Sequence, residues 1–275
     1  MLGKVVFVLR AQAAGKLGMF PGNQLHGALF HLLAQQDAVF SARLHAAPDK
    51  PFAMTPLFQG QGVGAWPSQL GAAAARQLRP VQAGQYWYWR VTALNQELLQ
   101  HLQAVPCGSR FVVNDIPWEL AACCTMHDEH PEAGELSEQD LRAAVAQLPD
   151  RANVQLTFLT PATFRHMQLN YPWPDPRILF PSLASRWARV GLTPLAWAGQ
   201  LEFCQHIVPN RWRGESVHIR FDQHKQYEGF VGSFSYNLQL LTAEQRQQIR
   251  LLAWFASLAG VGRMTAHGLG VVSCK

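Results

Sequence analysis

The sequence has little charge, few cysteines and no long apolar run. Only 15% of its 275 residues are Asp, Glu, Lys or Arg, against roughly 25% in an average globular protein. The five cysteines are odd in number and lack a regular spacing, which excludes a disulfide framework and favours a reducing, cytoplasmic compartment. No apolar run reaches the roughly 20 residues that a membrane helix needs. The run near the N-terminus is also too short for a signal peptide, so we expect no membrane association through a span.

What remains is a basic, apolar chain that can bury a core. Hydrophobic residues make up 48% of the sequence, the formal net charge is +5, and eleven histidines can add positive charge in mild acid. A positive balance favours an anionic partner, which is either a nucleic acid or a membrane surface.

One cluster contains residue types that bind zinc. Cys123, Cys124, His127 and His130 fall within eight residues. Structural zinc sites usually draw their ligands from two separated pairs, and this cluster forms only one group. A polar loop after a buried strand accounts for the same residues better, so we expect neither a metal nor another cofactor.

The hydrophobic pattern indicates two copies of one element order. The first copy has six segments that alternate between strand and helix periodicity: extended 4–9, helical 23–36, extended 51–60 and 85–94, helical 95–105 and extended 110–123. The second copy repeats the order: extended 153–161, helical 175–191, extended 201–209 together with 216–221, extended 229–240, helical 242–260 and extended 268–274.

Two β-α-β-β-α-β copies predict an α+β protein with tandem ferredoxin-like domains, the topology that RRM domains also have. We place the first domain at residues 1–133, a connecting segment at 134–151 and the second domain at 152–275. Capping boxes support two of the helices, because Ser137 precedes Asp140 and Thr242 precedes Gln245 by three residues.

A glycine-rich stretch, "GVGRMTAHGLGVV", lies between the last predicted helix and the last strand. It does not fit a dinucleotide-binding loop, which follows a strand and opens a helix, and it lacks the Gly-Lys-Ser/Thr ending of a P-loop. The remaining interpretation is a phosphate clamp in which backbone amides and Arg263 face a nucleic-acid backbone.

This stretch resembles the glycine-rich signature of the RAMP superfamily. Within that superfamily the chain is similar to the CRISPR-associated endoribonuclease that cuts precursor CRISPR RNA within its repeats, the sixth Cas family. Four other stretches carry the resemblance in the same order: residues 26–60, "VQLTFLTPATFRH", "PDPRILFPSLASRW" and "YEGFVGSFSYNL". The likeness therefore extends over almost the entire chain.

The resemblance implies a metal-independent transesterification, in which a 2′-hydroxyl attacks the adjacent phosphate and leaves a 2′,3′-cyclic phosphate and a 5′-hydroxyl. This chemistry needs a base, an acid and a cation. The resemblance assigns the base to His45 and the charge-stabilising role to Lys50. Some relatives have a tyrosine where this chain has Phe30, which leaves the acid open between His26 and His31.

RNA binding is expected at the glycine-rich stretch and at a basic segment of the second domain. The first set comprises Gly260, Gly262, Arg263, His267, Gly268 and Gly270. In the second, Arg211 and Arg213 flank Trp212, which is typical of a groove for an RNA stem, although a solvated β-hairpin explains these residues equally well. In "YWYWR", alternation sends either the two tyrosines or the two tryptophans into the core.

The resemblance also implies the partners. Repeat RNA, or precursor CRISPR RNA, is the expected substrate, and other Cas proteins of an effector complex or a second copy of the chain are open alternatives. The competing function is that of a non-catalytic RAMP protein that holds guide RNA. A general RNA-binding protein with two RRM-like domains is disfavoured, because the aromatic RRM strand motif is absent from the sequence.

Overall fold

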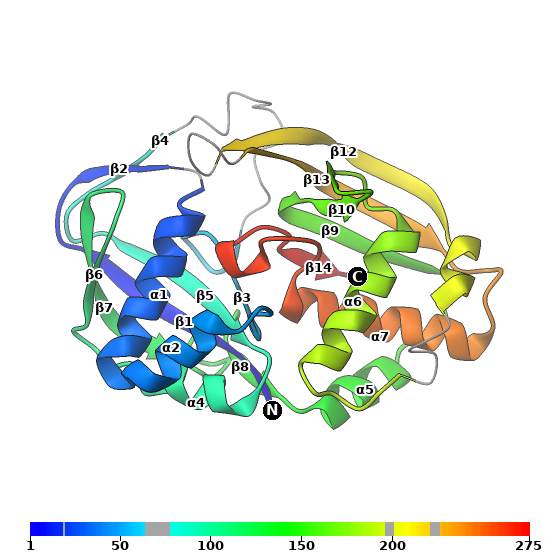
Figure 1. Cartoon of the computed structure of the whole chain (residues 1–275), viewed down its shortest axis with the longest axis horizontal. Helices are drawn as coiled ribbons and strands as arrows, with labels where there is room; N and C mark the ends of the chain where they lie inside the picture. Colours follow the sequence, from blue (N-terminus) through cyan, green and yellow to red (C-terminus); the bar gives the residue numbers. More distant parts are fainter. Residues whose placement is uncertain (19, 64–77, 196–200, 221–225) are drawn as a thin grey trace.

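The computed structural model describes the chain except for residue 19 and residues 64–77, 196–200 and 221–225. Two curled sheets lie side by side, and each has helices packed against one of its faces (Figure 1). The glycine-rich stretch lies between them, drawn in red in Figure 1. We refer to each sheet with its helices as the first and the second unit.

The first unit is built on an antiparallel sheet with the strand order β3-β5-β1-β7-β6. Its elements are β1 (Leu2–Ala11), α1 (Gly22–Gln36), α2 (Ala38–Ala46), β3 (Phe52–Met54), β5 (Tyr86–Ala93), α4 (Gln96–Gln103), β6 (Arg110–Val113) and β7 (Ile116–Cys124). A separate pair consists of β2 (Gly15–Gly18) and β4 (Leu78–Val81). Without the edge strand β6 the order is β3-β5-β1-β7, so β1 lies between β5 and β7. The first strand of a ferredoxin-like fold lies in the same way between the third and the fourth strands.

The second unit repeats this arrangement with the strand order β12-β13-β9-β14. Its elements are β9 (Asn153–Ala162), β10 (Phe164–His166), β11 (Leu169–Tyr171), α6 (Pro176–Arg189), η2 (Leu201–His206), β12 (Val208–Arg220), β13 (Gln226–Asn237), α7 (Ala243–Ala259), η3 (Thr265–His267) and β14 (Val272–Cys274). The predicted tandem ferredoxin-like architecture is confirmed.

The segment between the units is part of the structure of both. Its strand β8 (Gly134–Leu136) pairs with the start of β1 in the first sheet. Its helix α5 (Glu138–Ala146) begins with the predicted capping box of Ser137 and Asp140, and buries Leu141 and Val145 in the core of the second unit. The domain boundaries drawn from the sequence remain predictions.

Three segments differ from the sequence-based expectation. The predicted strand 51–60 is regular only over β3, since Pro51 and Pro56 flank it and proline cannot donate to a sheet ladder. The predicted strand 110–123 is a hairpin, in which Asn114 and Asp115 take positive φ values of 52° and 58°, as a tight hairpin turn requires. Residues 201–206 were expected to be extended and form the short helix η2 instead, with Phe203 and Cys204 buried.

Each unit has its own aromatic core. In the first, Trp87 and Trp89 are almost completely buried whereas Tyr86 is 51% exposed, so alternation along β5 sends the tryptophans inward. In the second, Trp187 packs edge-to-face on Phe255 with ring centroids 5.1 Å apart. Burying a large side chain contributes roughly 1.5–3 kcal/mol, so these rings are a main source of stability.

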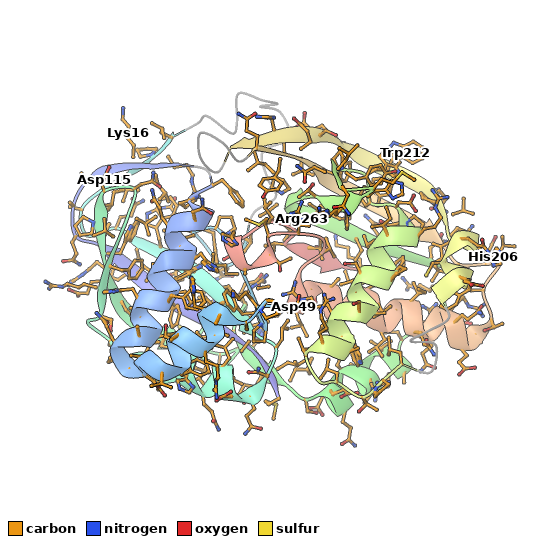
Figure 2. All side chains as sticks on the ribbon, in the orientation of Figure 1. Lys16, Asp49, Asp115, His206, Trp212 and Arg263 are labelled. Atoms are coloured by element: carbon orange, nitrogen blue, oxygen red, sulfur yellow. The ribbon has the colours of Figure 1, made fainter. Side chains whose placement is uncertain are left out.

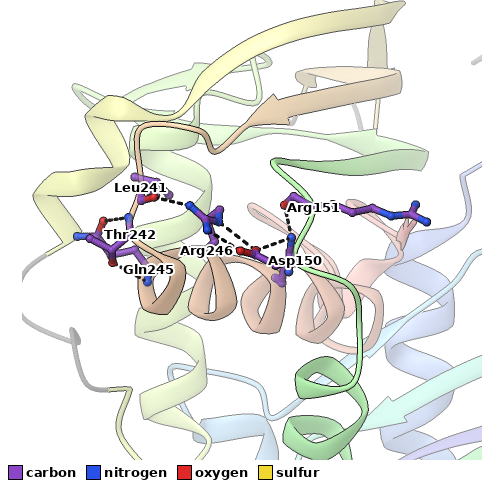
Figure 3. A network of polar contacts seen from close by, with 7 residues as sticks. Asp150, Arg151, Leu241, Thr242, Gln245 and Arg246 are labelled. Atoms are coloured by element: carbon purple, nitrogen blue, oxygen red, sulfur yellow. Dashed lines mark hydrogen bonds and ion pairs between the residues drawn. The ribbon is translucent and has the colours of Figure 1, made fainter.

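The last helix, α7, is fixed at its start by polar contacts (Figure 3). Thr242 and Gln245 form the predicted capping box. Arg246 donates from Nε to the carboxylate of Asp150 over 3.0 Å, and Arg250 forms an ion pair with the same carboxylate. These contacts join α7 to the segment that precedes β9, and α7 ends at Gly260 with a φ of +70°.

The cysteine–histidine cluster has a structural explanation. His130 is buried, its Nδ1 accepts a hydrogen bond from the Glu132 amide, and its ring lies 4.9 Å from that of Tyr88. Among the described residues, no group of three or more His, Cys, Asp or Glu side chains is arranged to hold a metal ion. Within the same part of the chain, no helix combines the length and apolarity needed to cross a membrane.

Candidate active site between the two units

A cleft of about 460 Å³ lies where the two units meet. Its lining comes from α1, from the segment after α2, from α6 and from the glycine-rich stretch. Figure 2 labels Asp49 and Arg263, which both lie in the middle of the molecule where the two units meet. Four cationic side chains line the cleft against one carboxylate: Lys50, Arg186, Arg189 and Arg263, with Asp49. The cleft is therefore suited to an anion.

His26 lies on α1 at the edge of the helix face that is buried against the sheet. Leu25 and Leu29 are fully buried, and His26, which follows Leu25, is partly exposed to the cleft. Its Nδ1 lies 3.0 Å from the carbonyl oxygen of Ala266, which is 240 residues away in the sequence. Its ring stacks on that of His267, with centroids 4.1 Å apart and planes 7° apart. The two units thus meet at this imidazole.

The surroundings of His26 lower its pKa. Burial is the largest cause, because it disfavours the charged ring, and the positive charges of Lys50 and His45 act in the same direction. The hydrogen bond to Ala266 opposes them. The neutral form of His26 is therefore favoured relative to an exposed histidine.

His45 is exposed near the C-terminal end of α2. Its ring centroid lies 6.4 Å from that of His26 and 4.9 Å from that of Phe30, which it meets edge-on. Helix α2 was not predicted from the sequence. It begins at the N-cap Asp37, whose side chain accepts a hydrogen bond from the amide of Phe40. Together α1 and α2 bring the two histidines to one edge of the cleft.

Lys50 holds the chain just after α2. Its ammonium group donates to the carbonyls of His45, over 2.6 Å, and of Ala47, over 2.5 Å. Partial burial lowers its pKa. An ammonium group has three protons, and these two carbonyls account for two of them. Lys50 therefore closes the end of α2 and also lines the cleft beside His26.

Two arginines of α6 are further members of the site that the sequence-based prediction missed. Arg186 donates to the hydroxyl of Thr265 and, over 2.8 Å, to the carbonyl of Phe52, so it ties the second unit to the first. Burial lowers its pKa to about 10, which leaves it charged at neutral pH. Arg189 pairs with Asp49 at 3.2 Å. The sequence signal was the pair of arginines three residues apart on a predicted helix.

The glycines of the closing stretch are required by its packing. Gly260, Gly262, Gly268 and Gly270 all have positive φ values, between 65° and 87°. A Cβ atom would lie 2.2 Å from the carbonyl oxygen of Thr163 if added at Gly262, and 1.9 Å from that of Val261 if added at Gly270. Only glycine fits there without strain.

The backbone of this stretch is largely satisfied within the protein. The amides of Gly260, Gly268 and Gly270 donate to the carbonyls of Ala256, Thr265 and Pro161. These three amides are engaged within the protein, and phosphate binding by the stretch stays a prediction. Gly260, Gly262, Arg263 and His267 line the cleft, whereas Gly268 and Gly270 are buried behind its lining.

Arg263 offers its guanidinium to the cleft from the second unit. Its Nη1 donates to Asn170 on β11 over 2.9 Å, and its guanidinium carbon lies 5.7 Å from the centre of the Tyr227 ring. A guanidinium has five N–H donors, so these contacts orient Arg263 and leave capacity for a phosphate.

Besides His45 at the edge and the two buried glycines, three predicted site residues lie outside the cleft lining. His31 is exposed on α1 and its Nε2 contacts Gln35. Arg211 and Arg213 are exposed on β12, where they pair with Ser235 and Ser233 of β13. Trp212, between them, stacks on the buried Phe234, so alternation along the strand turns the two arginines to the opposite face of the sheet.

Comparisons with known proteins show which family the chain is similar to. The family model of the "CRISPR-associated endoribonuclease Cas6" matches residues 156–272. The chain is similar to Cas6. The resemblance inferred from the sequence is thereby confirmed, and the matched region contains Arg186, Arg189, Arg263 and the glycine-rich stretch.

Individual Cas6 proteins are similar in sequence over part of the chain and in fold over all of it. A Cas6 endoribonuclease from Mycobacterium tuberculosis is 26% identical over 125 residues, which are 45% of this chain and 39% of that protein. This alignment thus spans less than half of the curated relative.

In fold, a Cas6 product complex superposes with a TM-score of 0.77 at 23% identity, covering 100% of this chain and 99% of that one. Thermus thermophilus Cas6 superposes with a TM-score of 0.70 at 22% identity, covering 100% of this chain and 98% of that one.

Proposed function

We propose that this protein is an endoribonuclease that cuts precursor CRISPR RNA within its repeats and so yields guide RNA. The observation that carries the proposal is the pairing of His26 and His45, with ring centroids 6.4 Å apart, at the edge of a cationic cleft. Two imidazoles on either side of a phosphate can act as base and acid near neutral pH. The similarity to Cas6 and its product complexes supports the choice of substrate.

In the proposed reaction the RNA backbone lies in the cleft with its scissile phosphate beside the two histidines. Lys50 and Arg263 stabilise the charge that develops on the phosphate oxygens. Arg186, which already bridges Phe52 and Thr265, holds the cleft in shape and adds positive potential. The cleavage leaves a 2′,3′-cyclic phosphate and a 5′-hydroxyl and requires no metal ion.

A second RNA contact is proposed on the open face of the second sheet. Arg211 and Arg213 project there beside two small hydroxyl residues, Ser235 and Ser233. Two exposed guanidinium groups without bulky neighbours suit the backbone of a repeat stem.

The first test is cleavage of repeat RNA in the presence of EDTA. His26→Ala and His45→Ala should each slow cleavage by on the order of 10²–10⁴-fold and leave RNA binding unchanged. His31→Ala, on the same helix but outside the cleft, should cleave normally, which separates the two candidates that the sequence left open. Full cleavage by both His26→Ala and His45→Ala would exclude this active site. Tight binding without cleavage by the unaltered protein would instead indicate a protein that only holds guide RNA.

A further inference from the structure

The contact between His26 and Ala266 fixes where the proton of the imidazole lies. A carbonyl oxygen can only accept a hydrogen bond, so the ring nitrogen that faces it, Nδ1 of His26, must carry the proton. In the neutral ring the other nitrogen, Nε2, then has no proton and presents a lone pair. Because His26 lines the cleft, Nε2 is the nitrogen left to meet a substrate there.

The ring of His26 is also held in orientation by its neighbours. His267 stacks on one face of the ring, and Phe30 lies 4.9 Å away, between the two histidines of the site. Such contacts restrict rotation of the ring, so the hydrogen bond to Ala266 has a stable geometry. The lowered pKa of His26 agrees with a neutral ring in the resting protein.

The carbonyl of Ala266 is itself held rigidly with respect to the first unit. Ala266 lies in η3, between Thr265, which accepts a hydrogen bond from Arg186, and His267. Gly268, directly after η3, packs against the first unit so closely that an added Cβ would lie 3.1 Å from the Pro56 nitrogen. The second unit thus holds the carbonyl oxygen of Ala266 in a fixed position beside the His26 side chain of the first unit.

We propose that Ala266 is a positioning residue that makes His26 the general base of the reaction and leaves the role of general acid to His45. This inference rests on the proposed function and reverses the role that the sequence resemblance gave to His45. His45 is exposed to solvent, whereas half-burial lowers the pKa of His26 and so favours its neutral form.

The proton transfers balance as follows. Nε2 of His26 takes the proton of the 2′-hydroxyl while the 2′-oxygen forms a bond to phosphorus. The bond from phosphorus to the 5′-oxygen breaks, and the imidazolium of His45 gives its proton to that oxygen. His26 ends protonated and His45 neutral, and exchange with water restores both.

Leaving-group replacement tests the two roles separately. Repeat RNA with sulfur in place of the bridging 5′-oxygen has a thiolate leaving group, which departs without protonation. On this RNA, His45→Ala should recover to within about tenfold of the unaltered protein, whereas His26→Ala should stay roughly 100-fold or more slower. Recovery of His26→Ala alone would overturn the proposal. Undiminished cleavage of ordinary RNA by both variants would refute the proposed function instead.

The tautomer can be measured without any reaction. In ¹⁵N spectra of the full-length protein, the signal that disappears in His26→Ala should show a protonated Nδ1 and an unprotonated Nε2 in the neutral ring. A protonated Nε2 would contradict the role of Ala266, whatever the cleavage rates are.

Substitution of Gly268 then tests whether the glycine-rich stretch sets this tautomer. Gly268→Ala should displace η3, increase the Nε2-protonated form of His26 and slow cleavage by about tenfold or more. The matched control is Gly108→Ala, since Gly108 has a φ of +86° against +87° at Gly268 and no atom near the added Cβ. Gly108→Ala should change neither the tautomer of His26 nor the cleavage rate. An unaltered tautomer in a folded Gly268→Ala protein would remove the stretch from this role.

Discussion

The two units share the β-α-β-β-α-β order but differ in one connection. In the first unit this connection joins helix α4 to the hairpin of β6 and β7, and in the second it joins helix α7 to strand β14. In the first unit, six residues, 104–109, join α4 to β6, and their only glycine, Gly108, has open space around it. In the second unit the connection from α7 to β14 is twice as long, contains η3, and packs against the first unit at Pro56. One topological position is thus a simple turn in one unit and part of the cleft in the other.

This difference explains how the cleft combines two chemistries. The first unit supplies the imidazoles of His26 and His45, and the second supplies the guanidinium groups of Arg186 and Arg263. The two proposed catalytic histidines and these two guanidinium groups therefore come from different units. The lining of the cleft comes from helices and from the segments that connect them to strands, and the two sheets hold these parts in place.

The two sheets also differ on the face that is not covered by helices, which we call the open face. In the first sheet this face carries Lys4 and Arg90, and Arg90 pairs with Glu132 from the segment that covers it. In the second sheet it carries Ser233, Ser235 and the exposed arginines that pair with them. The segment with Glu132 covers the first face, whereas the second face is exposed at Arg211 and Arg213 and is buried only farther along β12, where Val217 and Ile219 pack with Leu269.

The largest effect is expected from an alanine in the longer connection. Gly270→Ala combines a φ of +65° with a Cβ 1.9 Å from a carbonyl oxygen, so it should lower the free energy of unfolding by about 4 kcal/mol or more. Gly108→Ala, at a positive φ in open space, should cost only about 1–2 kcal/mol. Urea unfolding of the two variants measures the difference, and equal losses would mean that the two connections are equally tolerant.

The next effect is a pH dependence of stability that comes from Lys4 on the open face of the first sheet. Burial, with a smaller contribution from Arg90, lowers the pKa of Lys4 from 10.5 to about 8. Between these values the unfolded chain keeps a proton that the folded protein has lost, so stability rises with pH by on the order of 3 kcal/mol.

Lys4→Met should remove this rise and should be more stable than the unaltered protein near neutral pH. Lys16→Met, at an exposed position of β2, should leave the pH dependence as it is. The check is the unfolding free energy in urea at several pH values between 7 and about 10.5. Parallel pH curves for Lys4→Met and the unaltered protein would show that the first face does not bury a charge.

The smallest effect concerns RNA affinity. Arg263→Gln should weaken repeat-RNA binding by about 1 kcal/mol and reduce the slope of log K against log salt by about 1, because one phosphate contact is lost. Arg110→Gln, on the outer edge of the first sheet and paired with Glu119, should change neither value. A steeper or unchanged slope for Arg263→Gln would place the RNA backbone elsewhere.

Much of the fold follows from short-range patterns. Periodicity gave both β-α-β-β-α-β orders, and the capping boxes at Ser137 and Thr242 marked the helices that the structure contains. Helix α2 was missed because its nine residues have no distinct apolar stripe, and only Phe40, Ser41 and Leu44 are buried. A short helix of this kind is set by its contacts with a neighbour more than by its own sequence.

The site was predictable in its residue types and less so in its geometry. His26, His45, Lys50 and Arg263 were expected, and they lie in or beside the cleft. The sequence placed His26 on the rim of the apolar stripe of α1 and His31 away from it, but either side chain could reach a substrate lying across the helix, so the two could not be separated. Arg186 was missed because its importance comes from bonds to Phe52 and Thr265, 134 and 79 residues away.

The sequence by itself determined the units, their caps and the chemical types near the cleft, because helix and strand patterns and resemblance depend on neighbours along the chain. Only the tertiary structure decided that a carbonyl of the second unit meets an imidazole of the first. That contact depends on how the two cores pack together, which brings a side-chain nitrogen within 3.0 Å of a backbone oxygen 240 residues away, and no local pattern can relate the two.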